Sequence, residues 1–162
     1  MPTAQTITFE EFKGLRVAYL RDRGPAEQVS PPLMRKLRGV AVQHKLHGPD
    51  AIFLSIINDD PRSTEHGHVR VDAAVSVTAD FLPPKESGFA VRELLGGPHA
   101  VYRHVGSKKS LRDAWANMIS LPMPGYRLRS DAPSFEIHRN DPAHTPEGEL
   151  ITDLYQPVEP IR

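Results

Sequence analysis

The stretch Phe53–Val77, FLSIINDDPRSTEHGHVRVDAAVSV, recurs 81 residues later as Ser134–Val158, SFEIHRNDPAHTPEGELITDLYQPV, with seven of 25 positions identical. A second block, Ile7–Gly24, recurs 82 residues later as Phe89–Gly106, with five of 18 positions identical. Chance agreement at ordinary composition is about 6% per position, so twelve identities in 43 positions stand well above it. We therefore expect two copies of one structural unit.

Each copy has the pattern of two strands, a helix and two further strands. In the first copy we predict strands at Ile7–Phe12, Leu15–Arg21, Phe53–Ile57 and Val69–Val77, and a helix at about Val29–Leu46 that Ser30 and Pro31 begin. In the second copy we predict strands at Phe89–Leu95, Ala100–Val105, Phe135–Arg139 and Leu150–Tyr155, and a helix at Leu111–Ser120.

These elements predict an α+β fold for a single domain over residues 1–162. The copies, residues 6–80 and 88–158, are joined by a linker at Pro83–Gly88. We expect an antiparallel sheet with both helices on one face, because this arrangement buries one side of the sheet. Pseudo-two-fold symmetry then brings equivalent strands together at a central ligand cleft between the copies.

The composition excludes several classes of protein. Leu, Ile, Val and Phe make up about a quarter of the chain, enough for a folded core. Lys plus Arg and Asp plus Glu number 20 each, so we expect neither nucleic acid nor a membrane surface as a partner. The absence of Cys excludes disulfides and thiol catalysis. Without a signal sequence or a long apolar run, we expect a cytoplasmic protein.

Glu136 is the first candidate for a functional residue. Strand alternation places Glu136 and His138 on one face, and Phe135 and Ile137 on the other. If Phe135 and Ile137 pack against the helices, Glu136 points into the cleft. Its counterpart in the first copy is Ser55, so a carboxylate and a hydroxyl would meet there. From spacing alone, a solvated Glu on an exposed sheet face is the alternative.

The histidines do not predict a metal centre. His44 and His47 are three positions apart, and His66 and His68 are two apart, but no third ligand has convincing spacing. We expect surface histidines, no metal and no cofactor.

Other polar motifs have structural explanations. Arg70 and Asp72 alternate onto one strand face, which predicts an ion pair between them. Asp59-Asp60-Pro61 is typical of a turn. Gly96-Gly97-Pro98 predicts a hairpin turn rather than a phosphate-binding loop, because no helix follows it directly.

Seven short motifs occur in the order and spacing of one known family. They are Arg21-Asp22-Arg23-Gly24-Pro25, Asp59-Asp60-Pro61, Arg70-Val71-Asp72, Leu95-Gly96-Gly97-Pro98-His99-Ala100-Val101, His104-Val105-Gly106, Leu121-Pro122 with Gly125-Tyr126, and Pro133-Ser134-Phe135-Glu136-Ile137. From about Thr6 to Val158 the chain resembles the GyrI-like small-molecule-binding domain, the effector-binding domain of AraC-type and MerR-type transcription regulators. No single motif is specific, but seven in order are.

The resemblance implies a two-repeat α+β fold with a hydrophobic, aromatic-lined cleft. It implies that Glu136 is the family's central acidic residue, which contacts lipophilic cations in drug-sensing members. Trp115 matches the family's helix Trp, and its spacing from Leu111 and Ile119 predicts burial against the sheet.

Aromatic residues decide how well the cleft suits a cation. Tyr102, by alternation, and Tyr155, by the repeat, are candidates for the cleft wall, with ordinary core or edge-strand positions as the alternative. Ser120 stands where the family commonly has Trp, His138 where it has Tyr, and Ala26 where an aromatic often follows Gly-Pro. Each missing ring removes a cation–π contribution of roughly 0.5–2 kcal/mol.

We expect a stand-alone binding module for lipophilic small molecules, cationic ones included, that senses or sequesters a drug or effector. The ligand site would comprise Glu136, His138, Ser55, Tyr102, Trp115, Ser120 and Tyr155. The few residues before the fold leave no room for a helix-turn-helix, so regulation of transcription would need a partner protein. A homo-oligomer, a hydrolase of cyclopropanoid-type electrophiles that uses Glu136, and a gyrase-inhibitor-like interaction module are the alternatives.

Overall fold

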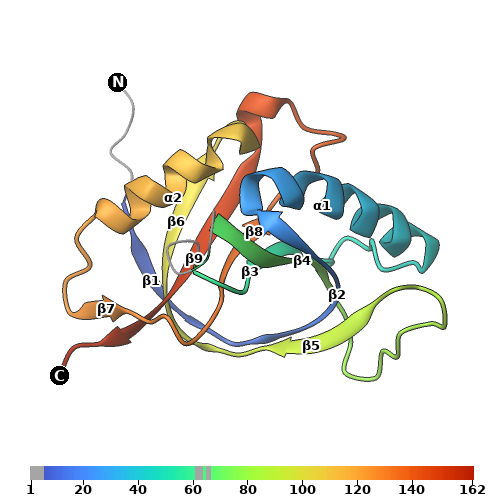
Figure 1. The fold of residues 1–162 in the computed structure, drawn as a ribbon, viewed down its shortest axis with the longest axis horizontal. Helices are drawn as coiled ribbons and strands as arrows, with labels where there is room; N and C mark the ends of the chain where they lie inside the picture. The colour runs from blue at the N-terminus through green and yellow to red at the C-terminus, as the bar shows by residue number, and fades with distance from the viewer. Residues whose placement is uncertain (1–5, 61–63, 65–66) are drawn as a thin grey trace.

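The computed structural model describes residues 6–60, 64 and 67–162, and these form the α+β fold expected from the sequence (Figure 1). The described residues contain nine strands, β1 Thr8–Phe12, β2 Leu15–Pro25, β3 Phe53–Ile57, β4 His68–Ser76, β5 Ala90–Leu94, β6 Gly97–Val105, β7 Tyr126–Leu128, β8 Ser134–His138 and β9 Ile151–Pro160. The helices are α1 Ala26–Gln43 and α2 Leu111–Ser120, with short 3-10 turns η2 Lys108–Ser110 and η3 Glu147–Glu149. Pro61 of the predicted turn and His66 lie outside the described residues.

The strands form one antiparallel sheet with β3 and β8 at its centre. Its order is β1-β6-β9-β8-β3-β4-β2-β5, and β7 pairs with the end of β9. The edge strands are exchanged between the two halves of the sequence, because β1 pairs with β6 and β5 pairs with β2. The hairpin predicted at Gly96-Gly97-Pro98 is therefore wrong. Strand alternation shows which residues share a face, but not which strand will be the neighbour.

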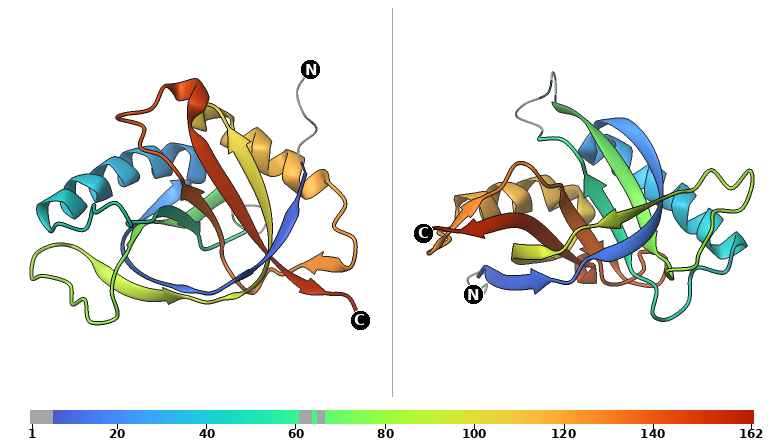
Figure 2. Two further views of the ribbon diagram at one scale, coloured as in Figure 1. Left: turned by 180° about the vertical axis from the view of Figure 1, so that it is seen from behind. Right: turned by 90° about the horizontal axis from the view of Figure 1, so that it is seen from below.

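The two links that carry the exchanged strands touch each other at Gly14 and Gly96. Gly14 has a φ of +86°, and a Cβ there would lie 3.1 Å from the Leu94 carbonyl oxygen. A Cβ on Gly96 would overlap the Phe12 carbonyl oxygen. Glycine at both positions lets the two backbones pass this closely. In Figure 2 the β1–β2 segment curves across the whole width of the sheet.

The first helix starts earlier than predicted. Helix α1 begins at Ala26, so Ser30 does not cap it and Pro31 and Pro32 lie inside it. Helix α2 has the predicted bounds, but its most buried residues are Ala114 and Met118 rather than the Leu111–Trp115–Ile119 stripe. Ile119 is 38% exposed, so the buried side of α2 is rotated relative to the prediction.

One row of directly paired residues shows which face carries the helices. From β2 to β6 this row contains Leu20, Ala73, Ser55, Glu136, Leu154 and Tyr102. Leu20 and Ala73 belong to the apolar core under α1, and Leu154 and Tyr102 belong to the core under α2. Both helices therefore cover the same face (Figure 1). Ser55 and Glu136 occupy the middle of the row on that face.

The opposite face has its own apolar core, and it contains Phe135 and Ile137. The condition on which Glu136 was expected to point away from the helices, namely that Phe135 and Ile137 pack against them, is therefore not met. Glu136 instead lies on the face that α1 and α2 cover. Their partners in this core are Val17, Leu54, Ile56, Ala74, Leu94 and Tyr155. Both faces of β8 are buried, so alternation alone did not indicate which face the helices would cover.

Two buried aspartates on this opposite face each hold two arginines. Asp72 pairs with Arg21 at 2.6 Å and with Arg92 at 2.8 Å. Asp153 pairs with Arg103 at 2.8 Å and with Arg139 at 2.7 Å. The predicted Arg70–Asp72 pair does not form, because Asp72 is occupied in this way and Arg70 instead pairs with Asp59 at 2.8 Å.

Candidate functional site

Polar side chains gather at the middle of the sheet, on the face that both helices cover. We call this group the central polar cluster. Its members are Ser30, Ser55, Lys108, Trp115, Glu136, His138 and Thr152. They come from α1, α2, η2 and three neighbouring strands, β3, β8 and β9.

Glu136 is buried, and among the described residues its carboxylate accepts a single hydrogen bond. The side chain is 6% exposed, and the indole Nε1 of Trp115 donates a 2.7 Å hydrogen bond to its Oε2. Burial raises the pKa of the Glu136 carboxyl, and the Trp115 hydrogen bond and the charge of Lys108 offset only part of this rise. Among the described residues, neither a Lys nor an Arg forms an ion pair with Glu136.

His138 connects a lysine to two serines. Lys108 Nζ donates to its Nδ1 over 2.6 Å, so the proton of the neutral ring is assigned to Nε2, which donates to Ser55 Oγ over 2.9 Å. Ser55 Oγ lies 3.0 Å from Ser30 Oγ. Burial and the charges of Lys108 and Arg38 hold the pKa of His138 well below its usual value, so the ring is neutral at pH 7.

Lys108 adds a cation to the cluster. Its Nζ also donates to Thr152 Oγ1 over 3.1 Å. Burial lowers the pKa of Lys108 to about 8, although the Glu136 carboxylate raises it; the charge of Arg38 lowers it further. At pH 7 the ammonium form still predominates, since this pKa lies above 7.

The two helices reach the cluster through equivalent positions. Ser30 is the fifth residue of α1 and contacts Ser55, and Trp115 is the fifth residue of α2 and contacts Glu136. Glu27 and Arg112, in the first turns of the two helices, form an ion pair at 3.9 Å. The amino-terminal ends of both helices therefore converge over the centre of the sheet.

The structure brings four of the seven predicted site residues together, namely Ser55, Trp115, Glu136 and His138. Tyr102 lies in the same row of the sheet but is buried under α2. Tyr155 lies on the opposite face, where its ring stacks on Phe135 at 4.8 Å and Arg139 donates to its hydroxyl. Ser120 is exposed, and its hydroxyl donates to the backbone carbonyl of Asn117 in the same helix.

Three members of the cluster were not predicted. Thr152 pairs directly with His138 in the sheet, so alternation through Leu154 could have placed it on the same face. Ser30 was interpreted as a helix cap because the helix was predicted to begin at about Val29. The helix in fact begins at Ala26, so Ser30 lies inside it. Lys108 lies in a short turn before α2, and turn lysines carry no sequence signal of burial.

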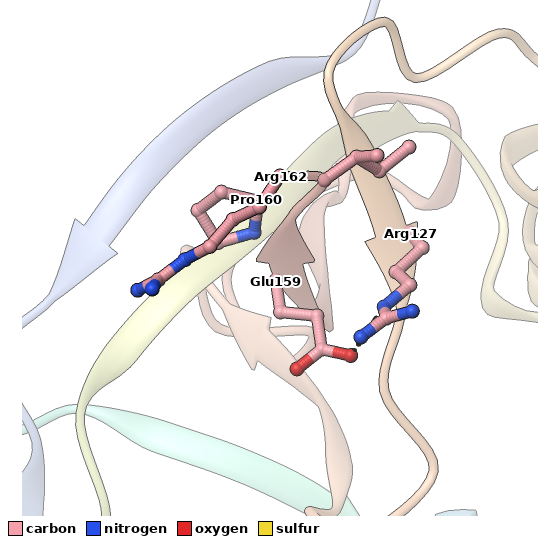
Figure 3. Close-up of a pocket in the computed structure, with 5 residues that line it drawn as sticks. Arg127, Glu159, Pro160 and Arg162 are labelled. Atoms are coloured by element: carbon pink, nitrogen blue, oxygen red, sulfur yellow. Dashed lines mark hydrogen bonds and ion pairs between the residues drawn. The ribbon is translucent and has the colours of Figure 1, made fainter.

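A surface hollow of about 400 Å³ lies elsewhere, at the end of β9 (Figure 3). Its lining residues are Arg127, Glu159, Pro160, Ile161 and Arg162. Arg127 and Glu159 form an ion pair at 2.5 Å, with exposed side chains. Because this hollow shares no residue with the central polar cluster, we do not assign it a function.

Residues 5–159 match the family model of the GyrI-like small molecule binding domain. The chain belongs to this family. It is 28% identical over 158 residues to a protein named DNA gyrase inhibitor from Serratia proteamaculans (strain 568), covering 95% of this chain and 98% of that protein.

Solved structures share the fold at low sequence identity. The EcmrR C-terminal domain has a TM-score of 0.71 at 16% identity, with 98% of this chain and all of that chain covered. SAV2435 bound to tetraphenylphosphonium has a TM-score of 0.67 at 16% identity, with 95% and 94% covered. In a complex of EcmrR with DNA, this chain spans 58% of the EcmrR chain.

Neither helix in the described part of the chain is both long and apolar enough to cross a membrane. Among the described residues, His, Cys, Asp and Glu do not assemble into a group of three that could hold a metal ion.

Proposed function

We propose that this protein binds lipophilic small molecules, cationic ones included, over the central polar cluster between α1 and α2, and so senses or sequesters them. Membership of a small-molecule-binding family supports binding as the activity. The observation that supports this location for the ligand is the buried Glu136 carboxylate, which accepts a hydrogen bond from Trp115. The division into two copies, residues 6–80 and 88–158, with a ligand cleft between them, is part of this proposal.

A carboxylate in this position favours a ligand with positive charge. Burial removes hydration that the charged form needs, and Glu136 gains no ion pair among the described residues in return. A cation that enters supplies the counter-charge in a low-dielectric environment, where the attraction is stronger than in water. Trp115 adds an aromatic ring whose edge already contacts the carboxylate. The relative SAV2435, whose structure holds tetraphenylphosphonium, shows that the fold accommodates such a cation in that protein.

The test compares a cation with a neutral molecule of similar shape. Tetraphenylphosphonium and triphenylphosphine oxide are titrated by calorimetry into the wild type, Glu136→Gln and the control Glu149→Gln, which changes an exposed Glu. We expect Glu136→Gln to weaken the cation tenfold to a hundredfold, about 1.4–2.8 kcal/mol, and the oxide far less. Equal losses for both probes would remove charge recognition from the proposal.

Trp115 gives an independent measure of location. It is the single Trp of the chain, so the intrinsic tryptophan fluorescence comes entirely from the cluster. Binding over Glu136 must change this fluorescence. Binding that leaves the emission unchanged would place the ligand elsewhere on the protein.

Catalysis by the same carboxyl is a second candidate. A buried carboxyl whose pKa is raised toward neutrality can transfer a proton or direct a water molecule at an electrophilic substrate. The test is whether the protein hydrolyses a cyclopropane-bearing compound. If Glu136→Gln abolishes this hydrolysis while binding persists, the protein is an enzyme rather than a binding module. A supercoiling assay with the purified protein tests the gyrase-inhibitor alternative, because a relative carries that name.

A further inference from the structure

Two cationic side chains lie beside His138, at one end of the central polar cluster. Lys108 contacts His138, and Arg38 on α1 is close enough to lower the pKa of both residues. Arg38 forms an ion pair with Asp141 at 4.0 Å, and the Asp141 side chain is 42% exposed. Glu136 is the only buried carboxylate that acts on Lys108 among the described residues. Among the described residues, the acidic neighbours of these two cations are thus the buried Glu136 beside Lys108 and the more exposed Asp141 beside Arg38.

Lys108 has donor capacity that the protein does not use. An ammonium group has three N–H donors, and His138 Nδ1 and Thr152 Oγ1 accept two of them. In the described part of the chain the third finds no protein acceptor, and Lys108 forms no ion pair. The side chain is only partly buried, so an acceptor from outside the protein can approach it.

The position of Arg38 is not explained by its own contacts. Its guanidinium carbon lies 4.2 Å from the centre of the Phe53 ring, and Phe53 pairs directly with His138. Its Nε is buried without a hydrogen-bond partner in the described structure. A buried donor without an acceptor is unfavourable, so a group that accepts from this guanidinium would stabilise the arrangement.

We propose that Lys108 and Arg38 form a subsite for an anionic group of the ligand, in the class of carboxylates, above His138. This inference rests on the proposed binding at the central polar cluster and specifies its ligand. The apolar body of the molecule lies beside Trp115, a donor or cationic group faces Glu136, and the acid lies between the two cations. Guanidinium and ammonium groups both make strong charge-assisted hydrogen bonds to carboxylates, which fixes the ligand's orientation.

The experiment uses a matched pair of aromatic probes, 2-naphthoate and 2-naphthamide, together with tetraphenylphosphonium. Each is titrated by calorimetry into the wild type, Lys108→Met and Lys109→Met. Lys109 is the exposed neighbour, so its substitution changes the net charge equally without touching the cluster. Arg38→Met is the second test variant, and thermal melting shows which variants remain folded.

We expect the wild type to bind 2-naphthoate at least tenfold more tightly than 2-naphthamide. Lys108→Met should weaken 2-naphthoate about tenfold, leave 2-naphthamide within twofold and leave tetraphenylphosphonium unchanged or tighter. Arg38→Met should act in the same direction, and Lys109→Met should change none of the three by more than twofold.

Three results would overturn the anion subsite alone. The first is that the wild type binds 2-naphthoate and 2-naphthamide with equal affinity. The second is that Lys108→Met weakens both probes equally. The third is that Lys109→Met weakens 2-naphthoate as much as Lys108→Met does. In each of these cases the neutral and cationic probes still bind, so the proposed function stands. If none of the three probes binds, the proposed function itself falls and the subsite falls with it.

Discussion

The indole nitrogen of Trp115 lies 2.7 Å from the carboxylate of Glu136 and connects α2 to the central strand β8. On the other side of the sheet centre, Ser30 connects α1 to Ser55 in the same way. The two connections differ in chemistry, since one ends on a carboxylate and the other on a hydroxyl. In the function proposed above, this difference would let the site distinguish the two ends of a ligand.

Trp115→Phe should destabilise the protein by about 1–3 kcal/mol, because it removes the donor to a buried carboxylate and leaves the acceptor unpaired. Urea unfolding at pH 7 measures this loss. The matched double variant, Trp115→Phe with Glu136→Met, shows whether the hydrogen bond is responsible. We expect the loss from Trp115→Phe to shrink in the Glu136→Met background, and strict additivity would assign it to packing of the ring alone.

Glu136→Gln should leave the free energy of unfolding equal or raise it, by on the order of 1 kcal/mol at pH 7. The amide oxygen can still accept from Trp115. The folded-state pKa of Glu136 is raised, so the wild type loses stability as the pH rises from the unfolded value near 4.5 through the folded value. Glutamine does not titrate, so its advantage should appear only as the pH rises. The control Glu149→Gln should show no such pH-dependent advantage.

His138 should make the protein less stable in mild acid. Its folded-state pKa is well below the ordinary value of 6.5, so the unfolded chain binds a proton that the folded chain excludes. The free energy of unfolding should fall by up to about 1.4 kcal/mol per pH unit as the pH drops below 6.5. Buried His99 has a lowered pKa for the same reason and adds to the slope.

His138→Gln should therefore reduce the pH dependence between 6.5 and 5, whatever it does to stability at pH 7. Urea unfolding across this range gives the slope directly. The control is His47→Gln, which replaces an exposed histidine. An unchanged slope in His138→Gln would mean that His138 takes up its proton in the folded protein as readily as in the unfolded chain.

The sequence predicts the helices and strands of this fold better than it predicts which strands pair with each other. The bounds of β3 and α2 agree with the prediction. The exchange of β1 and β5 was missed because any edge strand with suitable alternation can pair with either half. The orientation of β8 was missed because Phe135, Glu136, Ile137 and His138 are all buried.

The residues of the candidate site could likewise be predicted only in part. Glu136 and His138 could be predicted as neighbours because alternation places them on one face, and Ser55 because the repeat matches it with Glu136, although the face that the helices cover could not. Lys108 and Arg38 could not, since the turn before α2 and the packing of α1 bring them there from outside the strands. In the anion subsite that we propose, these two cations change the expected ligand from a simple cation to a molecule that also carries an acid.

Gly96→Ala tests the crossing of the two exchanged links. The new methyl group would overlap the Phe12 carbonyl oxygen, which is backbone and cannot turn away as a side chain can. We expect a loss of about 1–3 kcal/mol, typical of overpacking, in the free energy of unfolding measured with urea. Gly39→Ala is the matched control, because Gly39 lies in α1 with open space around it. There the same change should stabilise the helix by up to about 1 kcal/mol. If Gly96→Ala were neutral or stabilising, the two links would not pass as closely as described, and the exchange of β1 and β5 would need another path through the sheet.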